Sequence, residues 1–469
     1  MSKQNEQLLR KIPSVDYFLN NEEIKGISLG VPMQIVADSV REAVEQTRQS
    51  LVTEKQSETS EKAIHDKIIA GMKERIDLFK KPYYCKAINA TGIILHTGLG
   101  RAVLPDAAMR QIREELSGYS LLQLDIETGK RSRRDEGIEW LLQKLTGAEG
   151  AAVVNNNAAA TAIVLNTIAK GKEVIVSRGQ LVEIGGSFRL PDVVAFSGAK
   201  LIEVGTTNRT HGRDYENAIT ENTAAILRVH PSNYKISGFT AEVAVEELVR
   251  IAHSKGLVMI DDIGSGALID FSRFGFAKEP TVQDSIKAGA DIVTLSADKL
   301  IGASQAGIIL GKANLINAIR KNQFARIVRV GKLTLTVLEA TLKLFFDEET
   351  AVKEVPTLQM MTKKQADIGR QAKKIVSELK KINIKAEIET IEGFSQAGSG
   401  SMPEQDLPTT LAAIKPKSMS IEALALKLRQ YKPPIFARIA EDRLLIDPRT
   451  LLDGEDKIVI KALVEILRV

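Results

Sequence analysis

Apolar residues recur at helical spacing in the first 80 positions of the chain and fall into short continuous runs after about residue 85. The helical spacing is clearest at 31–52 and 63–79, which predicts two amphipathic helices. The motif KKP at 80–82 ends the second helix, because proline lacks a backbone N–H and disfavours helix in the residue before it. We therefore predict an N-terminal helical domain over residues 1–82.

Short apolar runs alternate with helical segments in the next part of the chain. Strands that are apolar on both faces and alternate with helices indicate a mostly parallel sheet covered on both sides. This pattern predicts a large α/β domain over residues 83–346 that ends in a long helix at 333–346. The seven expected strands are 151–154, 173–176, 200–204, 224–229, 257–260, 291–295 and 307–310.

A smaller α/β domain is expected over residues 347–469. Pro356 marks its start, and a Gly/Ser/Pro-rich loop interrupts it at 395–403. The expected elements are helix 365–381, strand 385–391, helix 421–431, strands 435–439 and 443–446, and a last helix.

Composition narrows the class of protein. The 469 residues are 44% hydrophobic with a net charge of +5, which suits a globular chain and selects no partner. The single cysteine, Cys85, excludes a disulfide scaffold and a cysteine-built zinc site, so we expect no metal. No run of 18 apolar residues and no signal-peptide stretch is present. We therefore expect a soluble cytoplasmic protein without a membrane span.

Two chemically distinctive residues follow strands of the predicted parallel sheet. Asp262 follows strand 257–260, and Lys299 follows strand 291–295. The carboxyl ends of parallel strands meet at one edge of a sheet, where ligands bind. Pyridoxal phosphate needs an amine for its Schiff base and a carboxylate beside its pyridine nitrogen. The sequence therefore predicts a pyridoxal-phosphate site with Lys299 as the amine and Asp262 as the carboxylate.

A phosphate cradle is expected at the end of strand 151–154. Asn156, Asn157 and Ala158 lie where an alanine-rich helix begins, and free backbone N–H groups at a helix start bind phosphate. Ser296, just before Lys299, adds a hydroxyl.

Each of these signals also has an ordinary structural explanation. A lysine is usually a solvated surface group, and aspartate at a strand end commonly caps a helix or forms a turn. The run of asparagines also fits a polar loop. Their coincidence at one sheet edge favours pyridoxal phosphate. Nicotinamide binding ranks lower, because Gly98-Leu99-Gly100 lacks a third glycine and a strand–helix setting.

Longer motifs of the chain lie at 88–105, 145–160, 173–193, 203–210, 229–239, 261–266 and 296–311. Together they resemble a known family, bacterial selenocysteine synthase or L-seryl-tRNA(Sec) selenium transferase. The resemblance extends from 11–19 to 433–455. It implies a fold-type I pyridoxal-phosphate enzyme that converts seryl-tRNA(Sec) to selenocysteinyl-tRNA(Sec). In such enzymes the serine hydroxyl is eliminated to give aminoacrylyl-tRNA, and selenium from selenophosphate is added.

The resemblance also implies roles for individual residues. Lys299 forms the Schiff base and, once freed, moves protons, while Asp262 pairs with the pyridine nitrogen. Asp298 and Asn233 match family positions, the first in the catalytic group and the second on the substrate side. His230 stacks on the cofactor ring, although a core histidine explains it as well.

Arginines suit an anionic selenium donor, because a guanidinium binds phosphate with paired hydrogen bonds. The resemblance places them at Arg101, Arg133, Arg134, Arg326 and Arg329. The alternatives are a basic surface loop for 131–134 and a solvated helix face for the last two.

Some residues depart from the family pattern, mostly on the substrate side. The family uses its N-terminal helical domain to bind tRNA, yet residues 1–80 hold 12 basic and 13 acidic residues. By analogy we expect a dimer-based homo-oligomer, a decamer. The departing positions are Gly98, Ser132, Asp135-Glu136-Gly137, Gln180, Ala297, Ala303 and Ser304.

Two other functions compete with the selenium transferase. One is a related pyridoxal-phosphate lyase acting on a small amino acid or amino sugar acid, for which the helical domain has no use. The other is a non-enzymatic binding paralogue, which has little reason to keep Lys299 and Asp262 together.

Overall fold

A computed structural model describes residues 9, 11–53, 60–185, 188–234, 236–382, 384–402 and 405–468. The chain divides into two compact units, Met1–Lys86 and Ala87–Val469. Within the described residues, no helix combines the length and apolarity needed to cross a membrane.

The first unit is helical, as the apolar spacing predicts. Its long helices pack against each other and bury residues at i, i+4 spacing, among them Ile64, Ile68, Met72 and Ile76. Ser60 caps the last helix by accepting a hydrogen bond from the Ala63 N–H at 3.2 Å. The described helices are α2 (Val15–Leu19), α3 (Glu22–Ile27), α4 (Met33–Thr53) and α5 (Glu61–Lys80).

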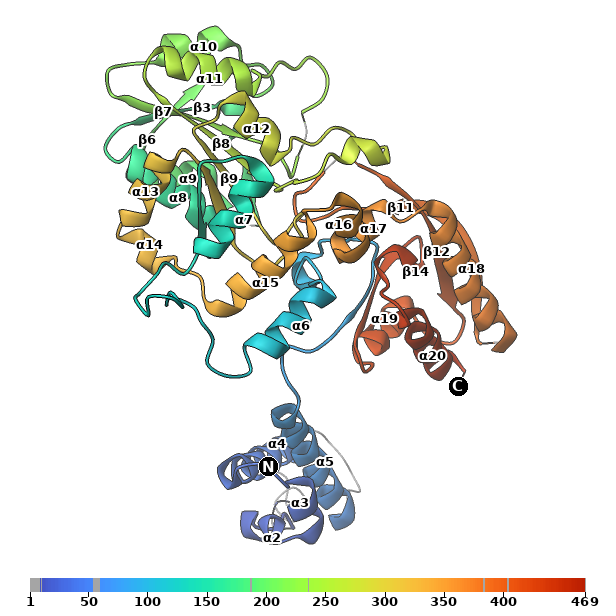
Figure 1. Cartoon of the computed structure of the whole chain (residues 1–469). Coiled ribbons are helices and arrows are strands. Elements are labelled where there is room, and N and C mark those ends of the chain that lie inside the picture. The colour runs from blue at the N-terminus through green and yellow to red at the C-terminus, as the bar shows by residue number, and fades with distance from the viewer. Residues whose placement is uncertain are drawn as a thin grey trace. The chain divides into compact units, whose positions relative to one another are not determined.

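The second unit contains a seven-stranded sheet in the order β2-β10-β9-β8-β7-β3-β6 (Figure 1). Strand β10 pairs antiparallel with both neighbours, and the other pairs are parallel. The predicted mostly parallel sheet is therefore confirmed. The strands are β2 (Gly150–Val154), β3 (Glu173–Ser177), β6 (Lys200–Val204), β7 (Thr223–Val229), β8 (Val258–Gly264), β9 (Ile292–Ser296) and β10 (Gly307–Gly311).

Helices cover both faces of this sheet. Successive residues of a strand point to opposite faces of the sheet. In β3, Val174 and Val176 therefore pack into one apolar cluster, and Ile175 packs into another on the opposite face. The first cluster includes residues of α8 (Asn157–Ile168), α9 (Leu190–Phe196) and α13 (Ala313–Lys321), and the second includes α10 (Gly212–Ala218) and α11 (Val245–Ser254). Further helices of this part are α6 (Asp106–Glu115), α7 (Glu136–Thr146), α12 (Val282–Ala288), α14 (Phe324–Ile327) and α15 (Lys332–Leu344).

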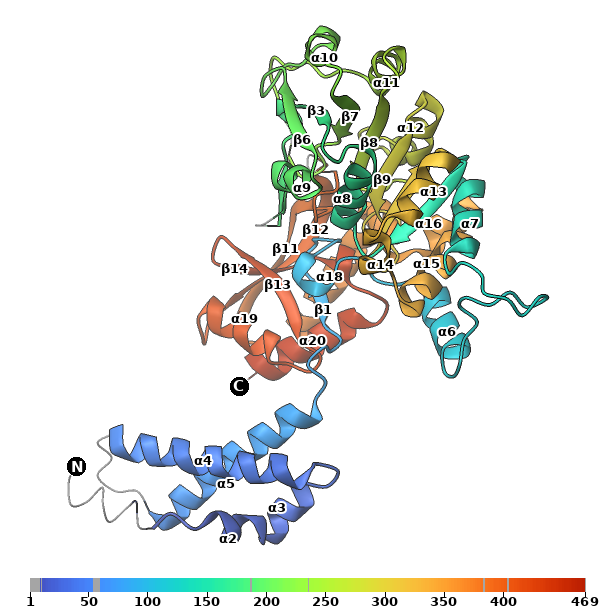
Figure 2. The same cartoon turned by 90° about the vertical axis from the view of Figure 1, so that its left-hand side faces the viewer.

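A second sheet of five strands has the order β1-β13-β14-β12-β11 (Figure 2). Its helices share one apolar cluster with it. Residues 88–90, which the sequence places in the large domain, form β1 and pair in parallel with β13. Strand β12 lies in a stretch for which the sequence suggested no element. The elements are β1 (Ile88–Ala90), β11 (Ala386–Ser395), β12 (Leu407–Pro416), β13 (Ile435–Ala440), β14 (Arg443–Ile446), α18 (Gln365–Ile382), α19 (Ile421–Arg429) and α20 (Glu455–Leu467).

Candidate active site

Asp262 lies inside β8 and points its carboxylate at α8. Its Oδ1 accepts a hydrogen bond from Asn157 Nδ2 at 2.8 Å, and its Oδ2 accepts one from Thr161 Oγ1 at 3.0 Å. The residue is only 5% exposed. Burial raises the pKa of Asp262 above its usual range, although both hydrogen bonds and the charge of Lys299 oppose the shift. Such a carboxylate gains from a cation or an N–H donor placed beside it.

Lys299 follows β9, the neighbour of β8 in the sheet. It is 6% exposed, and within the described residues its Nζ makes no hydrogen bond or ion pair. Burial lowers the pKa of Lys299, opposed by the charges of Asp262 and Asp298 and reinforced by that of Arg101. A buried amine with a lowered pKa is unprotonated more often, which is the form that attacks a carbonyl.

The start of α8 presents backbone N–H groups where the sequence predicts a phosphate cradle. Asn156 caps the helix, its Oδ1 accepting from the Ala159 N–H at 2.9 Å. The N–H groups of Asn157 and Ala158 remain without a partner in the described residues, at the positive end of the helix dipole. A Cβ at Gly307 would lie 2.2 Å from the Asn156 carbonyl oxygen. Only glycine therefore lets β10 pass this close to the turn.

His230 joins Asp262 to a buried carboxylate that the sequence did not indicate. The backbone N–H of His230 donates to the Asp262 carbonyl at 2.9 Å. The imidazole Nε2 of His230 lies 3.3 Å from Glu279 Oε1. Ser265 Oγ donates to the same oxygen at 2.6 Å. Burial opposes the charge of Glu279, yet the hydrogen bonds and charges of His230, Ser265 and Lys299 prevail and lower its pKa. Glu279 is therefore a carboxylate at the edge of the Lys299 site.

Asp298 and Arg101 form an ion pair directly beside Lys299. Arg101 Nη1 donates to Asp298 Oδ2 at 2.7 Å. Asp298 is 6% exposed, whereas the Arg101 side chain is 28% exposed. The backbone at Arg101 has φ +62, a region that residues other than glycine rarely adopt. The structure thus brings two of the sequence-predicted residues together through a residue in an unusual conformation.

Three other predicted arginines lie near one another. Arg134 donates to the Val330 carbonyl and to Gln123 Oε1, both at 2.7 Å. Burial lowers the pKa of Arg134, and the charges of Arg329 and Arg326 lower it further. Within the described residues, the side chains of Arg326 and Arg329 have no ion-pair or hydrogen-bond partner. Repelling cations without partners are typical of an anion-binding surface.

The remaining predicted residues have structural partners. Arg133 pairs with the buried Glu139 at 2.5 Å, so it contributes less free charge than the other arginines. Asn233 Nδ2 donates to the Glu183 carbonyl at 2.8 Å, while its buried Oδ1 has no partner. Ser296 is buried at the end of β9, and its hydroxyl makes no hydrogen bond within the described residues.

Two contributors to this arrangement were not predicted. Thr161 lies four residues after Asn157 on α8, and i, i+4 residues share a helix face, so the sequence held a signal for it. Glu279 belongs to the loop before α12 and had no periodic signal. Among the described residues, no three His, Cys, Asp or Glu side chains are grouped as metal ligands.

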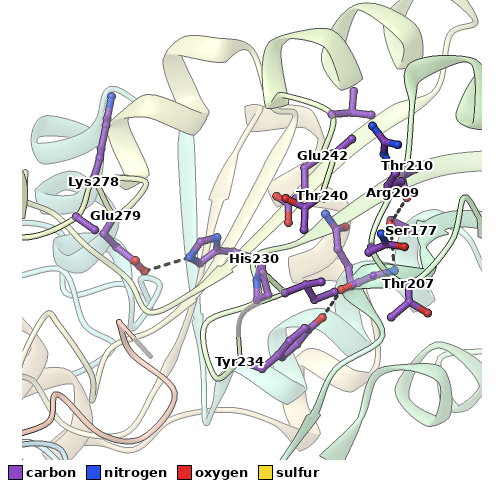
Figure 3. A pocket seen from close by; sticks show the side chains of 18 of the residues that line it. Ser177, Thr207, Arg209, Thr210, His230, Tyr234, Thr240, Glu242, Lys278 and Glu279 are labelled. Atoms are coloured by element: carbon purple, nitrogen blue, oxygen red, sulfur yellow. Dashed lines mark hydrogen bonds and ion pairs between the residues drawn. The ribbon is translucent and has the colours of Figure 1, made fainter. Parts of the chain in front are cut away.

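A cavity of about 360 Å³ adjoins the site (Figure 3). His230 and Glu279 lie on one side, and Ser177, Arg209 and Thr210 lie on the other. The cavity extends from His230 and Glu279 across the carboxyl ends of β7 and β3, and its described lining does not include Lys299 or Asp262.

Fold and site together define the class of protein. The solved structure of D-glucosaminate-6-phosphate ammonia-lyase aligns with a TM-score of 0.57, covering 82% of this chain and 96% of that one at 21% identity. The predicted fold class is confirmed, and the chain is a fold-type I pyridoxal-phosphate enzyme.

The particular family follows from sequence similarity. Residues 87–452 match the SelA family, described as L-seryl-tRNA selenium transferase. An L-seryl-tRNA(Sec) selenium transferase of Alkaliphilus metalliredigens is 46% identical over 97% of this chain and 98% of its own length. Those of Alkaliphilus oremlandii and Nitratidesulfovibrio vulgaris are 44% and 42% identical, covering 98% and 96% of this chain and 99% and 97% of their own. The chain belongs to the SelA family.

The described residues fit pyridoxal phosphate, the cofactor of this chain. Asp262 is a buried carboxylate fixed by two donors, and Lys299 is a buried amine without a partner. The unpaired N–H groups of Asn157 and Ala158 suit a phosphate.

Proposed function

We propose that this chain converts seryl-tRNA(Sec) to selenocysteinyl-tRNA(Sec), with selenophosphate as the selenium donor. The observation that carries this proposal is the 46% identity to a selenium transferase over nearly the full length of both chains. The local geometry agrees with it, since buried Asp262 lies in β8 and buried Lys299 follows the adjacent strand β9.

Four residues and one backbone segment hold the cofactor in this proposal. Lys299 supplies the linking amine, and Asp262 receives the pyridine nitrogen. The start of α8, at Asn156, Asn157 and Ala158, receives the phosphate. His230 and Ser296 border the ring and the linking lysine. When bound, pyridoxal phosphate withdraws electrons from the serine Cα, so that the Cα proton is lost and the hydroxyl can leave.

The protein's own groups move the protons. The lowered pKa of Lys299 lets its amine accept the Cα proton and return it later. Asp298 lies next to it in the chain and is held by Arg101, so it orients this region and balances its charge. Burial of both Lys299 and Asp298 excludes water.

Arginine side chains bind the anionic selenophosphate in this proposal. Arg326 and Arg329 have no partners within the described residues, so their guanidinium groups are available to selenophosphate. Arg134 holds the loop beside them. Arg101 is paired with Asp298 at the Lys299 side of the site. Arg133 contributes least, because Glu139 neutralises it. Asn233 is the substrate-side residue nearest His230 in sequence.

The wider arrangement follows the family expectation. We propose that the N-terminal helical domain, residues 1–82, binds the tRNA, and that 83–346 and 347–469 form the cofactor domain and the small domain. The active form is a dimer-based homo-oligomer, a decamer, in the cytoplasm. The small-molecule lyase is not favoured, because selenium transferases match this chain over nearly its whole length at twice the identity of the ammonia-lyase.

A direct conversion assay tests the proposal. Seryl-tRNA(Sec) is incubated with the holoenzyme and selenium-labelled selenophosphate, and the amino acid is then released and identified. We expect labelled selenocysteine with the natural protein and none with Lys299→Ala. Unlabelled serine recovered from both proteins would reject the function.

A further inference from the structure

Of the residues assigned to the cofactor, only His230 lines the cavity shown in Figure 3, so the function proposed so far leaves most of this cavity without an occupant. Its volume, about 360 Å³, lies within the range of ligand pockets, which is about 300–1,000 Å³. Serine at the Lys299 amine is far too small to fill it. The group that fills it must therefore be attached to serine or bind beside it.

The cavity lies next to the candidate active site through His230. This residue lines the cavity, and its backbone N–H donates to the Asp262 carbonyl at 2.9 Å. Glu279 also lines the cavity, and its Oε1 lies 3.3 Å from His230 Nε2. A substrate that reacts beside Asp262 therefore reaches the cavity by extending past His230.

Its walls suit a flat apolar ring. Tyr234 presents its ring to the cavity and is anchored by a hydrogen bond from its hydroxyl to the Gly179 carbonyl (Figure 3). Pro231, Ile236, Val243 and Met402 add apolar surface. An aromatic side chain beside apolar walls favours a nucleobase, which stacks whatever its identity.

The charged side chains that line the cavity suit the hydroxyls of a ribose and the charge of a phosphodiester. Glu242, Arg209 and Lys278 are exposed and line the cavity, and within the described residues none of their side chains has an ion-pair or hydrogen-bond partner. A carboxylate accepts hydrogen bonds from ribose hydroxyls, and the cations attract phosphate. Two carboxylates, Glu242 and Glu279, disfavour a free anion as the main occupant.

We propose that this cavity binds the 3′-terminal nucleoside to which the seryl group is esterified. The inference rests on the proposed function and adds to it a subsite for the nucleoside beside the reacting serine. The subsite makes the enzyme prefer an aminoacylated nucleoside to free serine without any contact from the N-terminal unit.

The experiment uses the holoenzyme and two amides that differ only in the nucleoside. The probes are 3′-seryl-amino-3′-deoxyadenosine and serine N-methylamide, and the readouts are calorimetry and the change in cofactor absorbance. We expect the nucleoside to tighten binding to the natural protein by about tenfold or more, since base stacking and a charged hydrogen bond each contribute on that order.

Variants of the cavity lining test whether the tighter binding of the nucleoside amide arises in this cavity. Thr240 is exposed, lines the cavity and makes no side-chain hydrogen bond within the described residues, so Thr240→Trp fills the space with little effect on folding. We expect Thr240→Trp to abolish the tenfold gain and Glu242→Gln to reduce it, whereas Thr240→Ser keeps it. The matched control is Glu221→Trp, at an exposed position that does not line the cavity. Retention of the cofactor band in each variant confirms its fold.

The proposed nucleoside subsite would be rejected by equal affinity of the two amides for the natural protein. It would also be rejected if Thr240→Trp kept the full tenfold preference for the nucleoside amide. Conversion of seryl-tRNA(Sec) by the natural protein is measured separately. Conversion without a nucleoside gain rejects the cavity alone, and a nucleoside gain without conversion rejects the proposed function alone.

Discussion

Arg101 Nη1 donates to Asp298 Oδ2 at 2.7 Å, one residue before the buried amine of Lys299. The pair places opposite charges beside one nitrogen. Asp298 raises the pKa of Lys299, whereas Arg101 lowers it. Burial has the largest effect on the pKa of Lys299, and the two members of this partly exposed ion pair act on it in opposite directions. The pair itself adds little stability.

Removing the two partners should shift that protonation in opposite directions. Arg101→Met removes a cation and should move the pH titration of the holoenzyme's visible band to higher pH, because the protonated nitrogen is then favoured. Asp298→Asn should move it to lower pH. Absorbance between pH 6 and 10 records both titrations; shifts in the same direction would contradict the electrostatic account.

The hydrogen bonds to Asp262 should matter for cofactor binding. Thr161→Val removes the 3.0 Å bond to Oδ2 while leaving the charge in place, which raises the pKa of Asp262 further. We expect weaker cofactor binding and a loss of about 1 kcal/mol in unfolding free energy. Asp262→Asn should reduce turnover by at least about 100-fold. Spectroscopic titration with the cofactor and chemical denaturation measure these effects, and unchanged cofactor affinity in Thr161→Val would argue against the assignment.

Gly307→Ala should damage the phosphate cradle. The new Cβ would lie 2.2 Å from the Asn156 carbonyl oxygen, so the turn before α8 must move. We expect the dissociation constant of the cofactor to rise by about tenfold or more. Gly137→Ala is the matched control, because nothing lies within 4 Å of its Cβ and the position is helical. It should stabilise the fold by about 0.5–1 kcal/mol and leave cofactor binding unchanged.

Glu279 should make stability depend on pH. Its folded-state pKa is lowered, so its ionised form stabilises the fold above the unfolded-state pKa, which is about 4.3. That stabilisation is lost as the pH falls through the lower folded-state pKa. The unfolding free energies of the natural protein and Glu279→Gln should therefore differ most near pH 7 and converge in acid. Denaturation at several pH values measures this; a difference that grows toward low pH would contradict the shift.

The sequence predicts which candidate site residues lie together where regular structure controls their positions. Parallel strands forced Asp262 and Lys299 to one edge of the sheet, and a helix start fixed Asn157. Glu279 could not be placed, because it reaches His230 from a loop whose path depends on tertiary packing. For the same reason β1 was not foreseen in the second sheet, since its partner β13 is far along the chain.

The arginines show a second limit. Charge and family pattern named Arg133 and Arg134 together, yet the first pairs with buried Glu139 and the second holds backbone and Gln123. Neighbouring residues in a loop point in different directions, and only the packed structure decides which charge remains free.

The most direct test of the account is the absorbance spectrum of the purified holoenzyme during titration with seryl-tRNA(Sec), with free serine and Lys299→Ala as controls. We predict a visible cofactor band that the variant lacks, and a spectral shift with seryl-tRNA(Sec) that free serine does not produce. A band that persists in Lys299→Ala would contradict the assigned lysine. A band in the natural protein that does not respond to the charged tRNA would contradict the substrate.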